Sequence, residues 1–200
     1  MAIVGITFLA RLRRYARSMA HTLWTISHST RDWDKFVALL QAAGIEVLAD
    51  VRRFAGSRRH PQFSGEAMAR QLAAASIAYV PMPALGGRRP PLPDSPNTAW
   101  RNASFRGYAD YMATDEYLAA RARLEALAIE RRVAVMCAEA LWWQCHRGLI
   151  ADDFKSRGWE VVHLLAADRQ EAHPYTAAAR IFDGRLDYRA APDPQPQLFE

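Results

Sequence analysis

The sequence predicts a single three-layer α/β domain, in which a mostly parallel sheet of about five strands is flanked by helices. Short apolar runs alternate along the chain with longer segments of helical periodicity. Parallel strands need crossover connections, and here the crossovers would be helices. Half of the 200 residues are apolar, which suffices for one compact core, and the chain is short for two domains.

The first half of the chain is expected to contain three strands and two helices. The apolar runs that predict the strands are residues 22–27, 45–51 and 77–82. Thr30 precedes the helical pattern of residues 31–44, which Gly44 would end. Ser64 is the expected N-cap of a second helix over residues 65–76.

The second half continues this alternation after a long irregular segment. Residues 83–107 are rich in proline and glycine, so neither a helix nor a regular strand should persist there. A short helix over 108–113 and a longer one opened by Thr114 would follow. The remaining elements are expected to be a strand at 132–139, a helix at 145–158 and a strand at 159–165.

The two ends of the chain are expected to lie outside this domain. Residues 1–18 contain four arginines and no acid, so they supply four of the five net positive charges of the chain. We interpret 1–18 as a basic extension, either disordered or the result of a misassigned start, and 19–180 as the domain. Residues 181–200 would form a loose tail, because prolines punctuate them.

Polar clusters follow four of the predicted strands. In parallel sheets ligands bind beyond the carboxyl ends of the strands, and these clusters would meet at that edge. They are "SHST", "DVRRFAGSRR", "PALGGRR" and "CAEALWWQCHR". Their coincidence predicts a functional site there.

Five segments, in order, resemble the bacterial and archaeal family called domain of unknown function 488. They are "TISHST", "ADVRRFAGSRRHPQF", "YVPMPALGGRR", "RNASFRGYADYM" and "MCAEALWWQCHRGLIAD", and the resemblance runs from about Leu23 to His163. The resemblance implies an α/β fold and a set of site residues, but it names no reaction and no cofactor.

Both cysteines of the chain lie in the last of these segments. A helix that begins near Cys145 would place its positive end beside His146 and Arg147, which favours either a bound anion or a reactive thiolate. Cys145 has a second interpretation as a small buried hydrophobic residue. Cys137 and Glu139 end the fourth strand, and Glu139 is either a general base or the ion-pair partner of an arginine.

A metal is a further possibility at the same place. Zinc would suit Cys137, Cys145, His146 and His28, but seven residues separate the cysteines, which is not the spacing of a zinc knuckle. A metal is therefore the less favoured interpretation and none is assigned to these residues, and a redox pair of the two cysteines is a further alternative.

Other candidate residues come from the remaining loops. His28 is a candidate acid or base, and Asp50 should pair with Arg52 because both lie on one side of the second strand. Ser57 and Arg58 form a candidate anion clamp.

Aromatic residues between arginines raise a different hypothesis. Arg106 and Tyr108 lie in a segment whose arginines could contact phosphates while its aromatic side chains stack on bases. Aromatic residues at these spacings also commonly close a core.

The leading hypothesis is a cytoplasmic enzyme that binds an anionic, phosphate-bearing substrate among Arg52, Arg58, Arg106 and Arg147. Cys145 or Cys137 would be its reactive thiol, and Glu139 or His28 would transfer protons. The alternatives are a noncatalytic nucleic-acid or nucleotide-binding module and a metal-dependent hydrolase. Partners would be an anionic small molecule or a nucleic acid. No membrane is expected, because no apolar stretch approaches the length of a membrane span.

Overall fold

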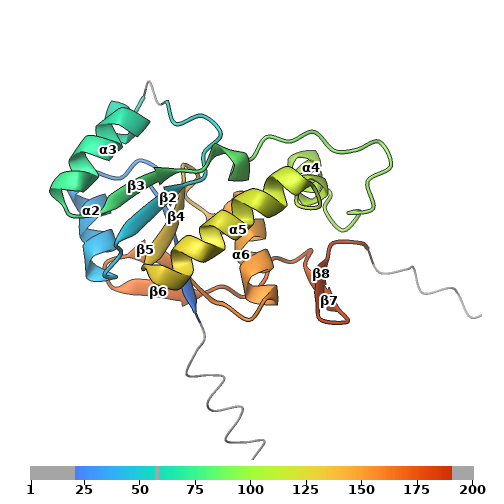
Figure 1. The fold of residues 1–200 in the computed structure, drawn as a ribbon. Coiled ribbons are helices and arrows are strands. Elements are labelled where there is room, and N and C mark those ends of the chain that lie inside the picture. Colours follow the sequence, from blue (N-terminus) through green and yellow to red (C-terminus); the bar gives the residue numbers. More distant parts are fainter. Residues whose placement is uncertain (1–20, 57–58, 191–200) are drawn as a thin grey trace, which may run out of the picture.

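The computed structural model describes residues 21–56 and 59–190, and it contains the predicted α/β domain (Figure 1). The main sheet has the strand order β3-β2-β4-β1-β5-β6. Its strands are β1 (Thr22–Ser27), β2 (Val47–Asp50), β3 (Ala78–Pro81), β4 (Val133–Cys137), β5 (Glu160–Ala166) and β6 (Arg169–Ala172). Strands β1 to β5 are parallel, and β6 pairs antiparallel with β5. The prediction of a mostly parallel sheet is therefore confirmed. The additional strand β6 is an edge strand that is largely exposed, so it lacks the apolar pattern that would predict it.

Helices cover both faces of the sheet. They are α2 (Trp33–Ala42), α3 (Gly65–Ala74), α4 (Ala103–Tyr111), α5 (Asp115–Glu130) and α6 (Arg147–Ser156), with short 3-10 turns η1 (Pro61–Phe63), η2 (Pro83–Leu85) and η3 (Trp142–Gln144). One hydrophobic core contains β-strand residues such as Leu48 packed against α2 and α3. The other contains residues such as Val47 packed against α4, α5 and α6. Successive strand residues point to opposite faces, so strands β1 to β5 each contribute to both cores.

Several helix boundaries follow their sequence signals. The N-cap side chains predicted for α3 and α5 are confirmed, since Ser64 accepts from the N–H of Ala67 and Thr114 from the N–H of Tyr117. The cap predicted at Thr30 is wrong. Residues 28–31 form a turn in which the N–H of Arg31 donates to the His28 carbonyl, so α2 starts only after Asp32.

The proline-rich segment after β3 is shorter than expected. Helix α4 begins at Ala103, because the Asn102 side chain accepts from the first free N–H groups at 2.8 and 3.4 Å. The preceding loop is held by the carboxylate of Asp110, which accepts from the backbone N–H of Leu92, the hydroxyl of Ser95 and the amide of Asn97 at 2.5–2.9 Å. One buried carboxylate thus orders a loop that has little regular structure.

The described part of the segment expected to be a loose tail is ordered. Strands β7 (Arg180–Phe182) and β8 (Arg185–Asp187) form a hairpin, and Tyr188 follows it. The Tyr188 ring is buried, and its hydroxyl donates to Asp152 at 2.8 Å. A contact of this kind between distant parts of the chain leaves no periodic signal in the sequence.

Asp152, on the buried face of α6, is the centre of a polar network. Its carboxylate accepts from Tyr188, from the N–H and hydroxyl of Thr176, and from Nε2 of His173 at 2.6–2.8 Å. Nδ1 of His173 lies 2.9 Å from Nε2 of His163, and Nδ1 of His163 lies 2.6 Å from the Thr25 hydroxyl. A carboxylate only accepts, so Nε2 of His173 donates its proton to Asp152.

The protein should lose stability below neutral pH because of His163. Burial, and then the charges of His173 and Arg147, lower the pKa of His163 to about 3. The unfolded chain then binds the extra proton below pH 6.5, so this stability is present above pH 6.5 and is lost as the pH falls toward 3. Between pH 7 and 5 the free energy of unfolding should fall by about 2 kcal/mol more than in His163→Gln, which cannot bind the proton. Denaturant unfolding across this range measures both, and equal slopes would contradict the assignment.

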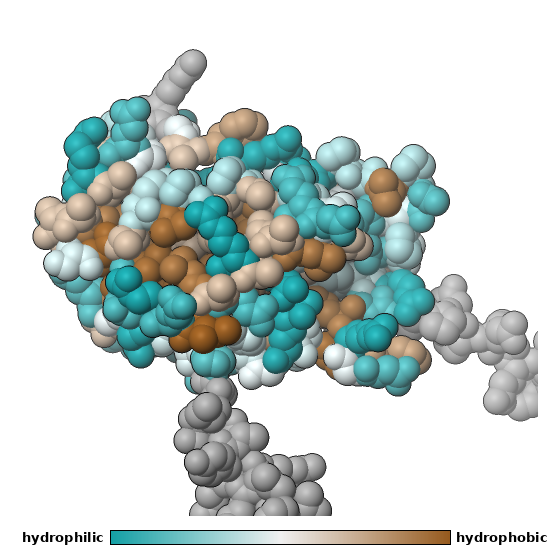
Figure 2. Space-filling model, in the orientation of Figure 1, coloured by the Kyte–Doolittle hydropathy of each residue, from teal (hydrophilic) through white to brown (hydrophobic). Residues whose placement is uncertain are grey.

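The surface of the domain is mixed. Figure 2 shows apolar residues among polar ones on the face that α5 crosses, and Leu118 and Ile129 of α5 are exposed. Among the helices of the two described ranges, none has the length and apolar character that a membrane span requires.

Candidate functional site

The carboxyl ends of the central strands meet at one edge of the sheet. Ser27, the last residue of β1, is in register with Cys137 at the end of β4. Asp50 at the end of β2 is in register with Met136 and with Pro81. A pocket of about 440 Å³ opens beyond this edge, and it is lined by residues that follow β2, β3 and β4 and by the start of α4. Part of the site expected at this edge therefore converges on one pocket.

Four side chains form a compact cluster on one wall of this pocket. They are Cys137, Glu139, Cys145 and His146, and one ligand atom from each lies within 4.8 Å of the others. Both thiols donate to Oε2 of Glu139, at 2.7 Å from Cys137 and 3.2 Å from Cys145. Nδ1 of His146 lies 3.9 and 3.8 Å from the two sulfur atoms. The two thiols are buried, whereas Glu139 is exposed at the surface of the pocket.

The loop between β4 and α6 brings the two cysteines together. The turn η3 reverses the chain, and the backbone N–H of Cys145 donates to the Trp142 carbonyl. Arg147, which is fully buried, holds the loop from behind by donating to the backbone carbonyls of Glu139 and Ala140 at 2.6 and 3.0 Å. The guanidinium thus contacts the main chain of Glu139, while the Glu139 carboxylate faces the thiols instead of forming an ion pair with an arginine. Arg147 is a positioning residue and does not line the pocket.

The environment of the cluster favours a protonated Cys137 thiol and a charged Glu139 carboxylate. The contact with Cys145, together with burial, raises the pKa of the Cys137 thiol well above its ordinary value. Burial alone would raise the pKa of Glu139, but hydrogen bonds from both thiols outweigh it and lower the pKa of that carboxyl below its usual range. Glu139 accepts hydrogen bonds from both thiols, and the reactive thiolate predicted at Cys145 stays a prediction.

His146 is held in one orientation by its other ring nitrogen. Nε2 lies 3.2 Å from the carbonyl of Val51, which can only accept, so Nε2 carries the proton. In this tautomer Nδ1 has a free lone pair on the side of the two thiols. Tyr108 packs against the ring with centroids 5.1 Å apart, and its hydroxyl donates to the Leu85 carbonyl. Tyr108 is fully buried, so it supports the site from behind and does not contact a ligand in the pocket.

Two adjacent glycines allow the loop after β3 to approach the cluster. A Cβ at Gly86 would lie 2.7 Å from the Arg53 backbone, and a Cβ at Gly87 would lie 2.9 Å from Nδ1 of His146. As a sequence pattern, the Gly-Gly pair matches a phosphate-binding loop only weakly. Its observed role is close packing against the pocket wall.

Gly87→Ala should therefore destabilise the protein by about 1–3 kcal/mol, because the added methyl group must displace the His146 ring. Gly56 also lines the pocket, but nothing lies within 4 Å of a Cβ built there, so Gly56→Ala is the matched control. The control should change the free energy of unfolding by less than about 0.5 kcal/mol. If chemical denaturation gives the two variants equal stability, the steric argument is wrong.

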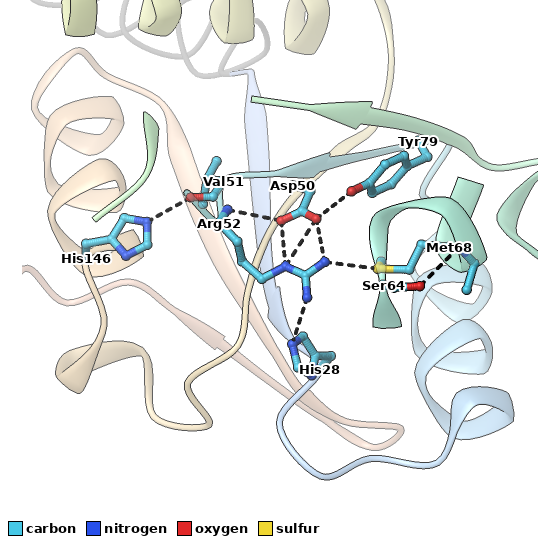
Figure 3. A network of polar contacts seen from close by, with 9 residues as sticks. His28, Asp50, Val51, Arg52, Ser64, Met68, Tyr79 and His146 are labelled. Carbon is cyan, nitrogen blue, oxygen red and sulfur yellow. Dashed lines mark hydrogen bonds and ion pairs between the residues drawn. The ribbon is translucent and has the colours of Figure 1, made fainter. Parts of the chain in front are cut away.

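Asp50 and Arg52 form the predicted ion pair beside the cluster (Figure 3). Asp50 accepts from Nε and Nη2 of Arg52 and from the hydroxyl of Tyr79 at 2.6–3.1 Å. Nη1 of Arg52 points to Nε2 of His28 at 3.2 Å, and Nη2 contacts the sulfur of Met68. The Arg52 guanidinium is thus buried, and its N–H groups contact Asp50, His28 and Met68. It is therefore less available to an anionic ligand than we expected.

His28 is bound on both sides of its ring. Nδ1 lies 3.0 Å from the Ser29 carbonyl, which only accepts, so Nε2 is the acceptor for Arg52. Burial, and then the Arg52 charge, lower the pKa of His28 to about 4. The ring stacks on Phe63 and does not line the pocket, so the structure does not bring His28 into the thiol cluster.

The comparison with known families supports the resemblance seen in the sequence. The family described as Domain of unknown function DUF488 matches residues 32–153, which is more than half of the chain. The chain belongs to the DUF488 family. No curated protein and no solved structure matches it. The DUF488 match contains all four cluster residues, and His28 lies just before it.

Two further sequence predictions for this DUF488 chain concern Arg106 with its aromatic neighbours and the anion clamp of Ser57 and Arg58. Arg106 donates to the backbone carbonyl of Trp100 at 2.9–3.0 Å and does not line the pocket. Of the aromatic residues near it, Tyr108 and Tyr111 are buried in the core, whereas Phe105 is half-buried and lines the pocket. Ser57 and Arg58 lie outside the described residues, and the clamp that they would form stays a prediction.

Sequence reasoning missed three DUF488 residues that line the pocket. Arg53 and Arg88 are exposed there, and Asn102 caps the helix at its far side. A signal for Arg53 and Arg88 was present in the sequence, because each belongs to a pair of adjacent arginines that follows a strand or a glycine pair. The sequence did not predict Asn102 as a helix cap beside the pocket, because α4 starts within the segment that we expected to be irregular.

Proposed function

We propose that this DUF488 chain is a cytoplasmic enzyme that acts on a small anionic substrate, such as a phosphate-bearing molecule, in the pocket beside Cys137, Glu139, Cys145 and His146. One observation carries this proposal. Arginine side chains line the same pocket as the thiol, carboxylate and imidazole groups, which are able to transfer protons. A volume of about 440 Å³ is in the range of small-molecule sites. The two free thiols agree with a reducing compartment.

The charge of the pocket supports an anionic substrate. Arg53 and Arg88 line it with exposed side chains, and Glu139 is the only acidic residue among the described residues that line it. Nη1 of Arg53 donates to the carbonyl of Arg88 at 2.9 Å, which holds the two residues together. Arg88 has a φ of +62°, an unfavourable conformation for a residue with a side chain. Strained residues of this kind are common at ligand sites.

Glu139 is the best candidate for proton transfer. It is exposed to the pocket, and its Oε2 already accepts protons in hydrogen bonds from both thiols. His28, the other candidate from the sequence, has both ring nitrogens in use within the protein. Both cysteines contact the same carboxylate oxygen, so we propose that activity depends on both of them.

The test is a turnover screen with small phosphate monoesters, nucleotides and carboxylates. Wild type should turn over at least one class, and Glu139→Gln should lower kcat by about 10²–10⁴-fold, the usual contribution of a general base. Arg88→Gln should raise KM with a smaller effect on kcat, because it removes a charge that attracts the substrate. Arg70→Gln, on the exposed face of α3, is the control that should change neither constant.

Two outcomes would contradict the proposal. If Glu139→Gln retains full activity, the cluster is not where the chemistry occurs. If no class is turned over while an oligonucleotide binds with strong salt dependence, the chain is a binding module.

A further inference from the structure

The thiol cluster has the composition of a transition-metal site. Two cysteine sulfurs, one imidazole nitrogen and one carboxylate oxygen lie within 4.8 Å of one another at the end of β4 and the start of α6. Sulfur and imidazole donors are those that Zn²⁺ prefers, and hard cations such as Mg²⁺ avoid them. The seven-residue separation that argued against a metal in the sequence is irrelevant in the fold, because η3 returns the chain to the end of β4.

The distances within the cluster are close to those of a tetrahedral site. Zinc bonds of about 2.3 Å to sulfur and about 2.0–2.1 Å to nitrogen place these ligand atoms about 3.6 Å apart. The observed distances from Nδ1 of His146 to the sulfurs of Cys137 and Cys145 are 3.9 and 3.8 Å. Oε2 of Glu139 is closer to the sulfurs, at 2.7 and 3.2 Å. It lies nearer than a ligand would, so the exposed carboxylate must move outward to admit an ion.

The ring of His146 is already set for coordination. Its Nε2–H is bound to the Val51 carbonyl, which leaves a free lone pair of Nδ1 on the side of the thiols. Metal-bound histidines commonly donate their other N–H in this way, because the hydrogen bond fixes both the tautomer and the orientation. Gly87 leaves the space beside Nδ1 free of a side chain, and Arg147 holds the loop that carries Glu139. The surroundings of the cluster thus position its donors.

We infer that Cys137, Cys145 and His146 bind one Zn²⁺ ion, with Glu139 as a fourth ligand that water or substrate can replace. Binding releases the two thiol protons. The two thiolates and the carboxylate then carry three negative charges, and the Zn²⁺ ion reduces the net charge of the site to minus one. Glu139 is exposed while the other three are buried or half-buried, so it is the ligand best placed to leave. This inference goes beyond the proposed activity and does not require it, because metal binding is measured without substrate.

The test uses the full chain, purified without chelators from zinc-supplemented medium. Elemental analysis should find about one zinc per chain, the value for a single site. Replacement by Co²⁺ should give the intense absorption of thiolate-to-cobalt charge transfer, which reports sulfur ligation directly. Titration of the apoprotein with Zn²⁺ against a chromophoric chelator then gives the affinity of each variant.

Matched variants identify the ligands. Cys137→Ser, Cys145→Ser and His146→Gln should each lower the zinc affinity by more than about 100-fold, whereas Glu139→Gln should lower it by about 10-fold, because an exposed ligand contributes least. His21→Gln replaces an exposed histidine at the opposite end of β1 and should bind zinc as wild type does. Far-UV circular dichroism shows whether each variant is folded. If a variant is unfolded, the cobalt spectrum of the wild type still decides the question.

Three results would overturn the inference. The wild type could contain no zinc and show no cobalt–thiolate absorption after loading. The serine variants, while folded, could bind zinc as tightly as the wild type. Thiol titration with mass spectrometry could show a disulfide in the purified protein, which would make the cysteines a redox pair. Zinc binding without turnover in the substrate screen would instead support the metal site and contradict the proposed enzyme.

Discussion

Asp50→Ala is expected to lower the free energy of unfolding by about 3–5 kcal/mol, the cost of leaving a buried charge without its partner. Asp50 and Arg52 are both buried, and the carboxylate accepts from the guanidinium, from the backbone N–H of Arg52 and from Tyr79. Its loss also frees the strand end whose Val51 carbonyl orients His146 (Figure 3). We therefore expect weaker zinc binding in the same variant. Chemical denaturation and chelator competition measure the two effects.

A double variant separates the lost ion pair from lost packing. Asp50→Leu combined with Arg52→Met removes both charges and should recover much of the stability, because an apolar pair of similar size needs no compensation. Tyr79→Phe removes a single hydrogen bond to the carboxylate and should cost about 1–2 kcal/mol. If Asp50→Ala is no less stable than Tyr79→Phe, the ion pair does not hold this end of the sheet.

Asp152→Ala should have an effect of similar size on the other side of the sheet. The carboxylate is completely buried and accepts four hydrogen bonds, from His173, Thr176 and Tyr188. Without it, several buried donors have no acceptor, which should lower the free energy of unfolding by about 3–5 kcal/mol. The hairpin of β7 and β8 should also become accessible to proteases at an earlier stage than the core, since Tyr188 anchors it to α6.

Asp152→Asn is the control for the size of the side chain. Its carbonyl oxygen keeps an acceptor while its amide places a donor opposite a donor, so we expect a loss of about 1–3 kcal/mol, between alanine and wild type. Denaturant midpoints and limited proteolysis measure both effects. Equal stability of Asp152→Ala and wild type would show that the network contributes nothing to folding.

The predictable part of the fold was the part with local, periodic signals. The apolar runs of β1, β2 and β4 are buried on both faces of the sheet, and residues such as Ser64, Thr114 and Gly44 carry side-chain or backbone requirements that act within a few positions. The location of the site also followed, because parallel strands bring their carboxyl ends to one edge.

The details of the site depended on contacts that only the fold creates. The sequence could not show that η3 returns Cys145 to the side of Cys137, or that Glu139 lies between two thiols. It favoured Arg52 as a ligand-binding residue, and its internal use by Asp50 and His28 became visible only in three dimensions. Position 87 has no room for a side chain because the ring of His146, which is distant in sequence, lies against it.

X-ray absorption at the zinc edge, on the full chain loaded with one equivalent of Zn²⁺, tests most directly whether Cys137, Cys145 and His146 act as one centre. We predict two sulfur atoms at about 2.3 Å and two nitrogen or oxygen atoms at about 2.0–2.2 Å, with one sulfur fewer in Cys145→Ser. A shell of oxygen and nitrogen alone, or an unchanged shell in Cys145→Ser, would show that the metal binds elsewhere and that the thiol cluster is not a metal centre.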